Sequence, residues 1–515
     1  MKKYALVGTG GRAGLYISAI GGTWRDNAKM VAFCDTNQTR MNYANKLLQK
    51  EGAEPVSTWK AVQFEEMIRE TRPDIIIVTT MDRTHDDYIV RALHAGCDVI
   101  TEKPMTIDEK RALRILDAIE ETGHTVRVAF NYRYAPHHSK VRELLMNNAI
   151  GEVYSVHFEW LLNTEHGADY FRRWHREKRN SGGLLVHKST HHFDLMNFWL
   201  ASYPERVYAE GSLQFYGKEN AEKRGVSQFY PRTHGYAEAK DDPFALNMAD
   251  NEQLKALYLD AEHEDNYFRD QSVFSDGITI EDTMSVLVKY QNQVQVTYSL
   301  NAYLPWEGLN VVFNGTEGRL EMKIIEKSYV NAGGERENEG SLEQCDITVF
   351  PMFAEPWKAE FNLGEGGHGG GDNAMLADLF GEPGNDPLQR AADLVGLKGY
   401  VTNITSTVMP AGEVITSYHD LWQVEQSFRM SKSDLAARPI YHYLRDSIEA
   451  HLTIVFTALA IARDLQVRTG WSIKRIVRAL RPLQHVTIRI AGGQQLHAEP
   501  TIPNDVAAML TRLGH

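Results

Sequence analysis

The 515-residue sequence is poor in cysteine, which limits how the chain can be held together. Its three cysteines, Cys34, Cys97 and Cys345, are too few for a disulfide framework and favour a reducing compartment. We therefore expect a cytoplasmic protein.

Long hydrophobic runs and an excess of positive charge are also lacking. The sequence begins Met-Lys-Lys-Tyr-Ala-Leu-Val-Gly, without the apolar core of a secretory signal peptide. The most apolar later stretch, 452–462, is too short to cross a bilayer. The formal net charge of -13 argues against a general binder of polyanions. We expect neither a membrane partner nor a nucleic-acid partner.

The remaining composition is that of a folded protein, with 43% hydrophobic and 24% charged residues. At about 100–200 residues per domain, the length suggests two to four domains. Charge divides the chain unevenly, because residues 394–515 carry a net charge of +4 and residues 1–393 carry -17. This difference indicates two parts of different character.

Strands and helices alternate through the first 125 residues. Short apolar or β-branched runs are separated by helical stretches such as 86–95, and this order predicts an α/β fold with a doubly wound parallel sheet. The expected strands are 4–7, 29–34, 74–79 and 98–101.

A glycine-rich turn follows the first strand and fits the pattern G-x-G-x-x-A at Gly8, Gly10 and Ala13. Gly8 permits a tight turn, Gly10 lets a pyrophosphate approach the backbone, and Ala13 allows close packing of helix on strand. Gly11 and Arg12 lie inside the turn. The N-terminus of the next helix supplies free N–H groups, so we predict a dinucleotide site here; the alternative is a purely structural turn.

Asp35 ends the second strand. A carboxylate at this position accepts hydrogen bonds from an adenosine ribose and repels a 2′-phosphate. We therefore expect NAD rather than NADP, although Asp35 could also be a simple turn residue.

Glu102-Lys103-Pro104 follows the strand 98–101, where ligands of open α/β sheets bind. Lys103 beside a nicotinamide could hydrogen-bond a substrate hydroxyl and stabilise negative charge on its oxygen. The alternative is a solvated surface lysine. We expect Glu102 and Lys103 to border the cofactor.

The segment 182–200, GGLLVHKSTHHFDLMNFWL, resembles an apolar helix entered by two glycines. Its spacing places His187, His191 and Asp194 on one face. A neutral histidine is a natural acceptor for a hydroxyl proton, and Asp194 could orient an imidazole. A core helix and a zinc site are the alternatives, but no third metal ligand is evident, so we predict no metal.

Two further stretches contain candidate substrate-binding residues. Arg133 and Tyr134 follow an expected strand at 125–130 and could reach the shared cleft. The glycine-rich loop 364–372 carries His368 and Asp372 and lacks the lysine of a P-loop, so a loop that covers the substrate fits better.

Alternating hydrophobicity between about 150 and 360 predicts a large, mostly antiparallel sheet with one free face. Polar insertions at 215–275 interrupt it. An open sheet of this kind often forms a subunit interface, so we expect a homo-oligomer. The expected strands are 152–160, 284–290, 294–300 and 309–312.

The motifs, in chain order, resemble those of the Gfo/Idh/MocA family, the relatives of glucose–fructose oxidoreductase and inositol dehydrogenase. They are the glycine turn, Glu102-Lys103-Pro104, Asn131-Tyr132-Arg133-Tyr134 and the segment 182–194. The resemblance covers about residues 1–393. It implies a Rossmann domain, a second domain with a large open sheet, and NAD(P)-dependent hydride transfer on a sugar, cyclitol or related polyol.

The same resemblance assigns roles by position. Lys103 matches the active-site lysine, His191 the histidine of the D-x-G-x-H pattern, and Asp194 the aspartate three residues later. His187 stands where the family has an aspartate, and Ser189 where it has a glycine. The base is therefore open between His187 and His191. The departure also keeps open the family's other chemistry, NAD-dependent glycoside cleavage, in which oxidation at C3 acidifies the C2 proton.

Residues from about 394 resemble the C-terminal end of insertion-sequence DDE transposases. Tyr418, Glu425 and Lys432 fit three of the four positions of the signature Y-x2-R-x3-E-x6-K, and Leu421 replaces the arginine. A lone Glu425 cannot hold the two metal ions that such enzymes use. The resemblance implies a fused, mostly helical fragment without transposase activity.

These observations predict three parts: a Rossmann domain at 1–125, a substrate and oligomerisation domain at 126–393, and a transposase-like fragment at 394–515. The predicted activity is NAD-dependent oxidation or reduction of a carbohydrate-like polyol. A DNA-binding tail and an inactive fusion product are the alternatives.

Overall fold

The structure is a computed structural model in which the chain forms two compact units, Met1–Leu394 and Val395–His515. In the first unit it describes residues 1–328, 330, 340–362 and 367–381. In the second it describes 457–458, 461–462, 464–481, 483, 486–489, 495–498 and 502–514. The transposase-like signature at 418–432 and part of the glycine-rich loop, 363–366, lie outside the described residues. No helix in the described ranges is long and apolar enough to cross a membrane.

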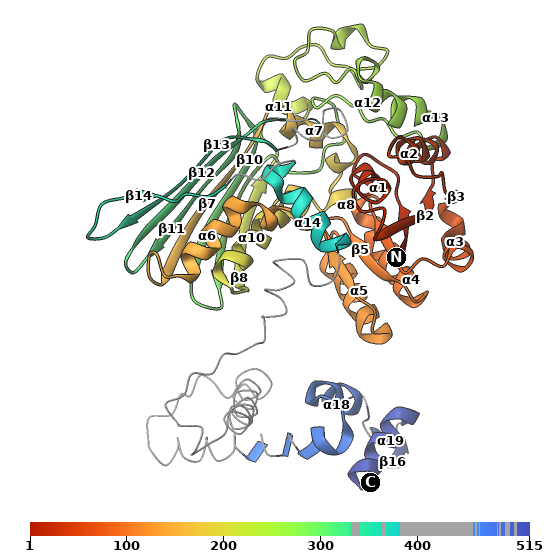
Figure 1. Cartoon of the computed structure of the whole chain (residues 1–515). Helices are drawn as coiled ribbons and strands as arrows, with labels where there is room; N and C mark the ends of the chain where they lie inside the picture. Colours follow the sequence, from red (N-terminus) through yellow and green to blue (C-terminus); the bar gives the residue numbers. More distant parts are fainter. Residues whose placement is uncertain are drawn as a thin grey trace. The chain divides into compact units, whose positions relative to one another are not determined.

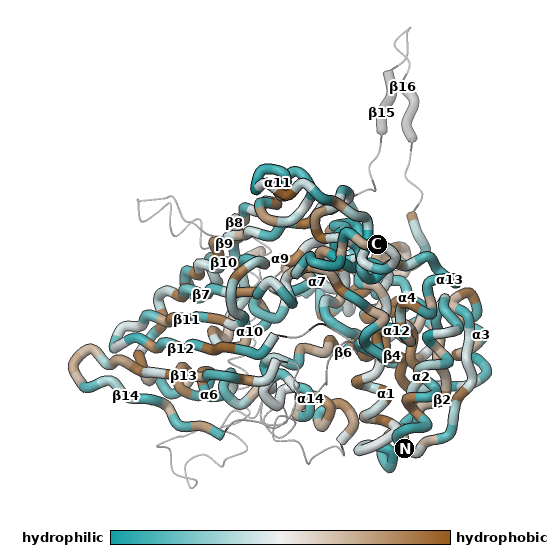
Figure 2. The backbone as a smooth tube through the Cα atoms, turned by 90° about the horizontal axis from the view of Figure 1, so that it is seen from above, coloured by the Kyte–Doolittle hydropathy of each residue, from teal (hydrophilic) through white to brown (hydrophobic). Residues whose placement is uncertain are grey.

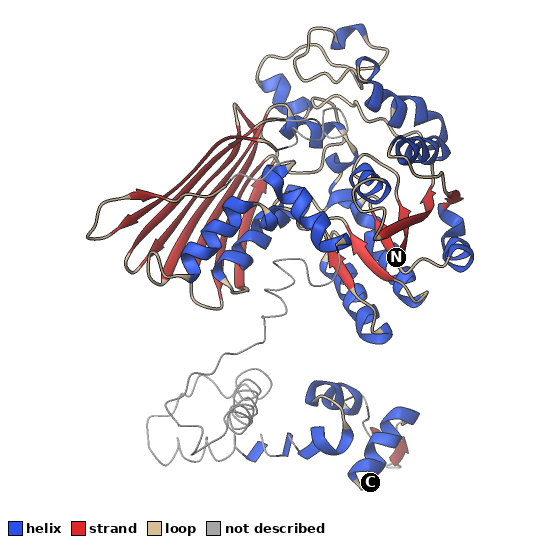
Figure 3. Cartoon of the chain, viewed as in Figure 1, coloured by secondary structure: helices blue, strands red, loops and turns tan. Residues whose placement is uncertain are grey.

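The N-terminal part of the first unit is built on a six-stranded parallel sheet (Figures 1 and 3). The strand order β3-β2-β1-β4-β5-β6 is that of a doubly wound nucleotide-binding fold, as the sequence predicts. The apolar run of β4 is buried along its whole length because helices cover both faces of the sheet. The strands are β1 Lys2–Val7, β2 Ala28–Asp35, β3 Ser57–Lys60, β4 Ile75–Val78, β5 Asp98–Thr101 and β6 Val126–Val128.

Two helical layers sandwich this sheet. One apolar layer includes α1 and α2, and the other includes α3, α4 and α5. The helices are α1 Ala13–Gly21, α2 Gln38–Lys50, α3 Phe64–Thr71, α4 His85–His94 and α5 Glu109–Thr122, with the short 3-10 turns η1 Ala61–Gln63 and η2 Asp82–Thr84.

The second part is an eight-stranded sheet whose strands lie side by side from β8 to β14 (Figure 2). Its order is β14-β13-β12-β11-β7-β10-β9-β8, and every pairing is antiparallel except that of β7 with β10. The strands are β7 Val153–Asn163, β8 Pro204–Ser212, β9 Thr283–Tyr290, β10 Gln295–Leu304, β11 Glu307–Gly315, β12 Gly318–Glu326, β13 Leu342–Pro351 and β14 Trp357–Lys358.

One face of the large sheet is covered and the other is open. Strand β9 alternates buried and more exposed residues. Its buried side chains pack with Trp160, Trp199 and Phe313 in one hydrophobic core. On the open face, Tyr208 and Leu287 are exposed. The covering helices and turns are α6 Pro136–Met146, α7 His166–Arg172, η4 Trp174–Arg176, α8 Lys178–Ser181, α9 Leu184–His187 and α10 Thr190–Leu200.

Two later segments return to the nucleotide-binding part. The insertion between β8 and β9 brings α12 and α13 beside α2 (Figure 1). Helix α14 packs Phe380 against Tyr4 of β1, with ring centroids 5.2 Å apart. The elements are α11 Lys218–Lys223, α12 Glu252–Leu257, α13 Glu262–Asp265, α14 Gly371–Phe380 and the turns η3 Tyr132–Tyr134, η5 Ala237–Ala239, η6 Met248–Asp250, η7 Leu259–Ala261 and η9 His368–Gly370.

The described part of the second unit is small. Helices α18 Ile473–Leu480 and α19 Asn504–Leu513 share an apolar cluster that includes Ile476, Val506 and Met509. A two-stranded hairpin, β15 Val486–Arg489 and β16 Gln495–Ala498, accompanies them.

Candidate active site

A single cavity of about 480 Å³ contains both the glycine turn and most of the predicted catalytic residues. It lies past the carboxyl ends of the parallel strands, where ligands of such sheets bind. From the glycine turn it is lined by Gly8, Gly10, Gly11 and Arg12, and from the two domains by Asp35, Glu102, Lys103, His187, His191 and His368.

The glycine turn has the geometry that a dinucleotide requires. Gly8 has φ +90°, and a Cβ there would lie 2.6 Å from the backbone nitrogen of Thr80, so no other residue fits without movement. A Cβ at Gly10 would meet no protein atom, so its backbone faces open space. Helix α1 begins at Ala13, directly after the turn. The turn and the helix N-terminus therefore fit the pyrophosphate of NAD.

Asp35 lies at the end of β2 and is oriented by the turn. The Thr9 N–H and hydroxyl donate to its Oδ2 at 2.6 and 2.9 Å, and the Asn37 N–H donates to its Oδ1 at 2.9 Å. The carboxylate borders the cavity. It is placed to meet an adenosine ribose.

Arg12 and Glu102 form an ion pair under the cavity. The Arg12 Nε donates to Glu102 Oε1 at 2.7 Å, and the buried Tyr16 hydroxyl donates to the same oxygen at 2.8 Å. Arg12 Nη2 also donates to Asp372 Oδ1 at 3.2 Å. These contacts join the glycine turn to β5 and to α14.

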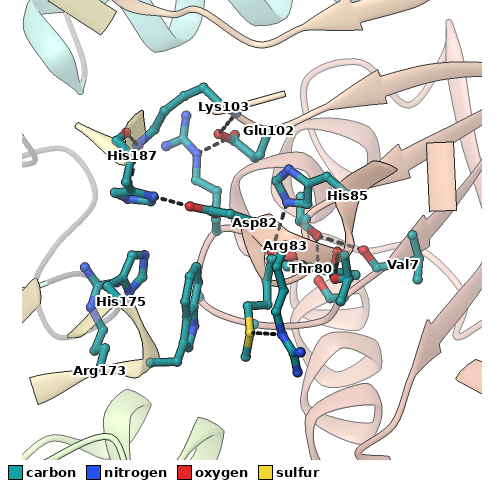
Figure 4. Close-up of a pocket in the computed structure, with 18 of the residues that line it drawn as sticks. Val7, Thr80, Asp82, Arg83, His85, Glu102, Lys103, Arg173, His175 and His187 are labelled. Carbon is teal, nitrogen blue, oxygen red and sulfur yellow. Dashed lines mark hydrogen bonds and ion pairs between the residues drawn. The ribbon is translucent and has the colours of Figure 1, made fainter. Parts of the chain in front are cut away.

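Lys103 follows Glu102 and points toward His187 from the other domain (Figure 4). Its Nζ lies 3.4 Å from His187 Nε2 and donates to the His187 carbonyl oxygen at 3.3 Å. Burial, reinforced by the positive charge of Lys188, lowers the pKa of Lys103 to about 8. A lysine with such a pKa can exchange a proton near neutral pH.

His187 in turn contacts a carboxylate that the sequence reading did not identify. Its Nδ1 lies 2.6 Å from Oδ2 of Asp82, a buried residue of η2 just after β4 (Figure 4). Burial and the nearby Lys103 charge hold the pKa of His187 well below its usual value, and burial raises that of Asp82. With Nδ1 facing Asp82, Nε2 of the ring is turned toward Lys103.

Asp82 supplies a carboxylate beside the imidazole that stands where the family pattern has an aspartate. The family pattern puts this aspartate on the same segment as its histidine, whereas here it comes from the nucleotide-binding domain, 105 residues earlier. Because β4 and β5 are parallel neighbours, the residues after their carboxyl ends, including Asp82 and Lys103, meet at one edge. This rule was available from the sequence and could have identified Asp82.

A second imidazole lines the same cavity. His191 packs against Tyr132, with ring centroids 5.2 Å apart, and burial together with the charges of Lys103 and Lys188 keeps its pKa well below the usual value. Lys188 also borders the cavity and lies 4.6 Å from the Trp160 ring centroid. Both histidines are therefore neutral and able to accept a proton.

The helix predicted through these histidines is interrupted. Helix α9 ends at His187 and α10 begins at Thr190, so one continuous face does not extend from His187 to Asp194. The structure does not bring Asp194 to an imidazole. Instead, both its carboxylate oxygens accept from Arg133, with the Nε–Oδ2 bond at 2.8 Å.

The candidate substrate-binding residues separate into two groups. Arg133 and Tyr134 lie outside the cavity lining, since Arg133 pairs with Asp194 and the Tyr134 hydroxyl donates to Asp378 at 2.6 Å. His368 lines the cavity. Asp372 lies behind it, with Oδ2 at 2.8 Å from His368 Nδ1 and Oδ1 accepting from Asn131 at 2.8 Å.

Asp82, His175 and His187 also form a possible cation site, because each offers a ligand atom and these atoms lie within 4.8 Å of one another. Two imidazoles and a carboxylate suit zinc or manganese. The Lys103 amine next to His187 and the nearby Arg173 charge oppose a divalent ion at this place. The expectation of no metal stays a prediction.

The comparisons with known proteins agree with this fold. Residues 2–130 match the Gfo/Idh/MocA model described as "Oxidoreductase family, NAD-binding Rossmann fold". Residues 142–379 match its companion, "Oxidoreductase family, C-terminal alpha/beta domain". Together these models account for most of the chain, which defines an NAD-binding oxidoreductase.

Among curated relatives, the oxidoreductase YteT of Bacillus subtilis strain 168 is 39% identical over 352 residues, which is 65% of this chain and 77% of YteT. D-glucoside 3-dehydrogenase of Escherichia coli K12 is 31% identical over 130 residues, covering 25% of this chain and 35% of the relative. Inositol 2-dehydrogenase of Rhizobium meliloti strain 1021 is 28% identical over 211 residues, covering 41% and 58%. The chain belongs to the Gfo/Idh/MocA family of oxidoreductases.

A solved structure, that of aldose-aldose oxidoreductase from Caulobacter crescentus complexed with glycerol, is similar at 14% identity and a TM-score of 0.49. The similarity covers 77% of this chain and 96% of that one.

Proposed function

We propose that this chain transfers hydride between NAD and a CH–OH carbon of a sugar, cyclitol or related polyol, with Lys103 as the group that exchanges the hydroxyl proton. The observation that carries this proposal is the line of contacts Lys103–His187–Asp82 in the cavity that also contains the glycine turn. The relatives named as glucoside and inositol dehydrogenases support a polyol substrate.

In the oxidation direction, the neutral amine of Lys103 accepts the proton of the substrate hydroxyl. Bound NAD would supply the hydride acceptor for the same carbon, which would become a carbonyl. The Lys103 ammonium that forms stays hydrogen-bonded to the His187 carbonyl oxygen, and the negative charge of Asp82 stabilises it. His191 and His368, which line the same cavity, are placed to orient the other hydroxyls of the substrate.

The test measures NADH formation with a panel of sugars and cyclitols. We expect turnover with at least one of them and a loss of at least 100-fold in kcat for Lys103→Ala, the scale of a lost acid–base group. A matched control is Lys110→Ala, on the exposed side of α5, which should keep the parent activity. Full turnover in both Lys103→Ala and His191→Ala would reject the assigned roles.

His191 favours a second candidate, NAD-dependent glycoside cleavage. A second neutral imidazole in the cavity could remove the C2 proton after hydride has left C3, and the aglycone would then depart from C1. Addition of water to the resulting double bond and return of the hydride to C3 would complete the cleavage without net oxidation. An aryl glycoside separates the two candidates: cleavage releases the phenol without net NADH, whereas simple oxidation accumulates NADH.

We also propose the organisation of the whole chain. Residues 1–128 form the NAD domain, because β6 extends the parallel sheet past the expected boundary at 125. The following residues to 393 form the substrate and oligomerisation domain, and 394–515 a transposase-derived fragment fused to it. The open face of the large sheet supports a homo-oligomer, and the scarcity of cysteine supports a cytoplasmic location. Comparing residues 1–393 with the full chain for NADH affinity, melting temperature and solution mass tests these assignments, and sequencing the gene around codon 393 tests the fusion.

A further inference from the structure

Groups that could bind an anion near the adenosine end of the cleft already contact acidic side chains of α13, in the insertion between β8 and β9. Asp35 marks where the ribose binds, and the N-terminus of α2 begins three residues later. A phosphate on the ribose 2′-oxygen would need positive potential at this place, from backbone N–H groups or an arginine. The chain has such groups here, and none of them belongs to the catalytic end of the cavity.

Glu264 occupies the start of α2. Its Oε2 accepts from the Gln38 N–H and its Oε1 from the Thr39 N–H, both at 2.7 Å, and Lys60 Nζ donates to Oε2 at 3.2 Å. Helix α2 has no acidic residue of its own in its first turn. Although burial disfavours its charged form, these donors outweigh that effect and lower the pKa of Glu264 to about 2. Glu264 is therefore an anion at every physiological pH.

Asp265 forms an ion pair with Arg40, the arginine at this place. Arg40 Nη1 donates to Asp265 Oδ2 at 2.5 Å, and Arg40 Nε donates to the Leu257 carbonyl at 3.2 Å. Both Arg40 and Asp265 border the cavity, so the pair faces the place where the adenosine end would lie. Asn37 Nδ2 adds a bond to Asp265 Oδ2 at 3.1 Å.

The same insertion also reaches the glycine turn. The Tyr258 hydroxyl accepts from the Gly11 N–H at 3.1 Å, and Tyr258 and Tyr267 line the cavity beside Arg40. Asp265 thus lies in the cavity lining and Glu264 directly before it, in a segment that contacts both the glycine turn and α2 (Figure 1).

We propose that Glu264 and Asp265 are specificity determinants that exclude NADP, because they occupy the α2 N-terminus, Lys60 and Arg40 with the protein's own carboxylates. Asp35 alone is the usual determinant at the end of β2, whereas here two acids more than 220 residues away in the sequence add a second barrier to the 2′-phosphate. This inference depends on NAD binding, which the family shows, and not on the proposed substrate or mechanism.

The test is equilibrium binding of NADH and NADPH, followed by nicotinamide fluorescence, to the full chain and to the double variant Glu264→Gln/Asp265→Asn. The ratio of the NADPH to the NADH dissociation constant should fall at least tenfold, because the freed cations can bind the 2′-phosphate. 2′,5′-ADP should gain affinity by a similar factor over 5′-AMP, and this probe requires no reaction.

The matched control is Glu262→Gln, because Glu262 lies on the same short helix but pairs with Arg232 instead of α2. It should leave the NADPH/NADH ratio within twofold of the parent. A variant that melts earlier while the ratio stays constant would show a purely structural role and overturn the proposal. An unchanged ratio with unchanged melting would overturn it as well. Absence of polyol turnover in the parent chain, together with a shifted ratio in the variant, would count only against the proposed reaction.

Discussion

The contact between Asp82 and His187 makes a quantitative prediction. In Asp82→Asn the amide can still accept a hydrogen bond from Nδ1, but it no longer provides the negative charge that stabilises the Lys103 ammonium. A hydrogen bond to a charged group contributes about 1.5–3 kcal/mol. The 2.6 Å contact is buried, so we expect its loss to raise the activation free energy by an amount within that range. This corresponds to a kcat about 10- to 150-fold lower.

The pH dependence supplies a readout that a merely structural role would not change. Lys103 accepts a proton only as the free amine, so the rate of oxidation should rise with pH through the Lys103 pKa of about 8. The Asp82 charge raises that pKa against the effect of burial. Its removal should therefore lower the pKa further and move the rise in rate to lower pH.

The assay is steady-state NADH formation between about pH 6 and pH 10, with NADH affinity measured alongside. Asp87→Asn is the matched control, since Asp87 is an exposed acid on α4 that pairs with Arg91 at the surface. A parent-like kcat in Asp82→Asn, or a rise in rate that stays in place or moves to higher pH, would refute the reasoning.

Three further outcomes follow from the structure. Gly8→Ala should weaken NADH binding at least tenfold, because the added Cβ would lie 2.6 Å from the Thr80 backbone nitrogen. The control Gly52→Ala, at φ +88° with no neighbour within 4 Å, should leave NADH binding unchanged. Equal NADH affinities of the two variants would contradict this prediction. Asp194→Asn should lower the melting temperature by a few degrees, because it weakens a half-buried ion pair with Arg133. Its effect on kcat should stay below threefold. A large loss of kcat in a stable variant would instead assign Asp194 to the active site. Dialysis against EDTA should leave the rate unchanged, because the Lys103 amine 3.4 Å from His187 disfavours a divalent ion; activity lost and then restored by zinc or manganese would show a metal site.

Local patterns predicted most of the N-terminal sheet but missed β3, which has no buried residue in its four positions. The strand 98–101 was expected and is found with the same bounds, and Asp35 and Gly8 lie where the turn motif puts them. In the large sheet the prediction found four strands and missed others. Strand β8, for example, is exposed along almost all of its length, so it has no buried face to produce an alternating pattern.

The candidate site was predicted in part. Lys103, His187 and His191 do share a cavity, but the helix through the histidines ends at His187, so Asp194 turns to Arg133. Helical periodicity assumes an unbroken helix, and a break of two residues is enough to redirect every side chain after it.

The sequence by itself determined the nucleotide-binding fold, the glycine turn and the chemical character of the cavity, because each depends on residues close together in the chain. Only the tertiary structure decided the partners: Asp82 for His187, and Glu264 and Asp265 for the start of α2. These partners come from segments about 100 to 230 residues apart, and a single sequence carries no record of which distant charges meet after folding.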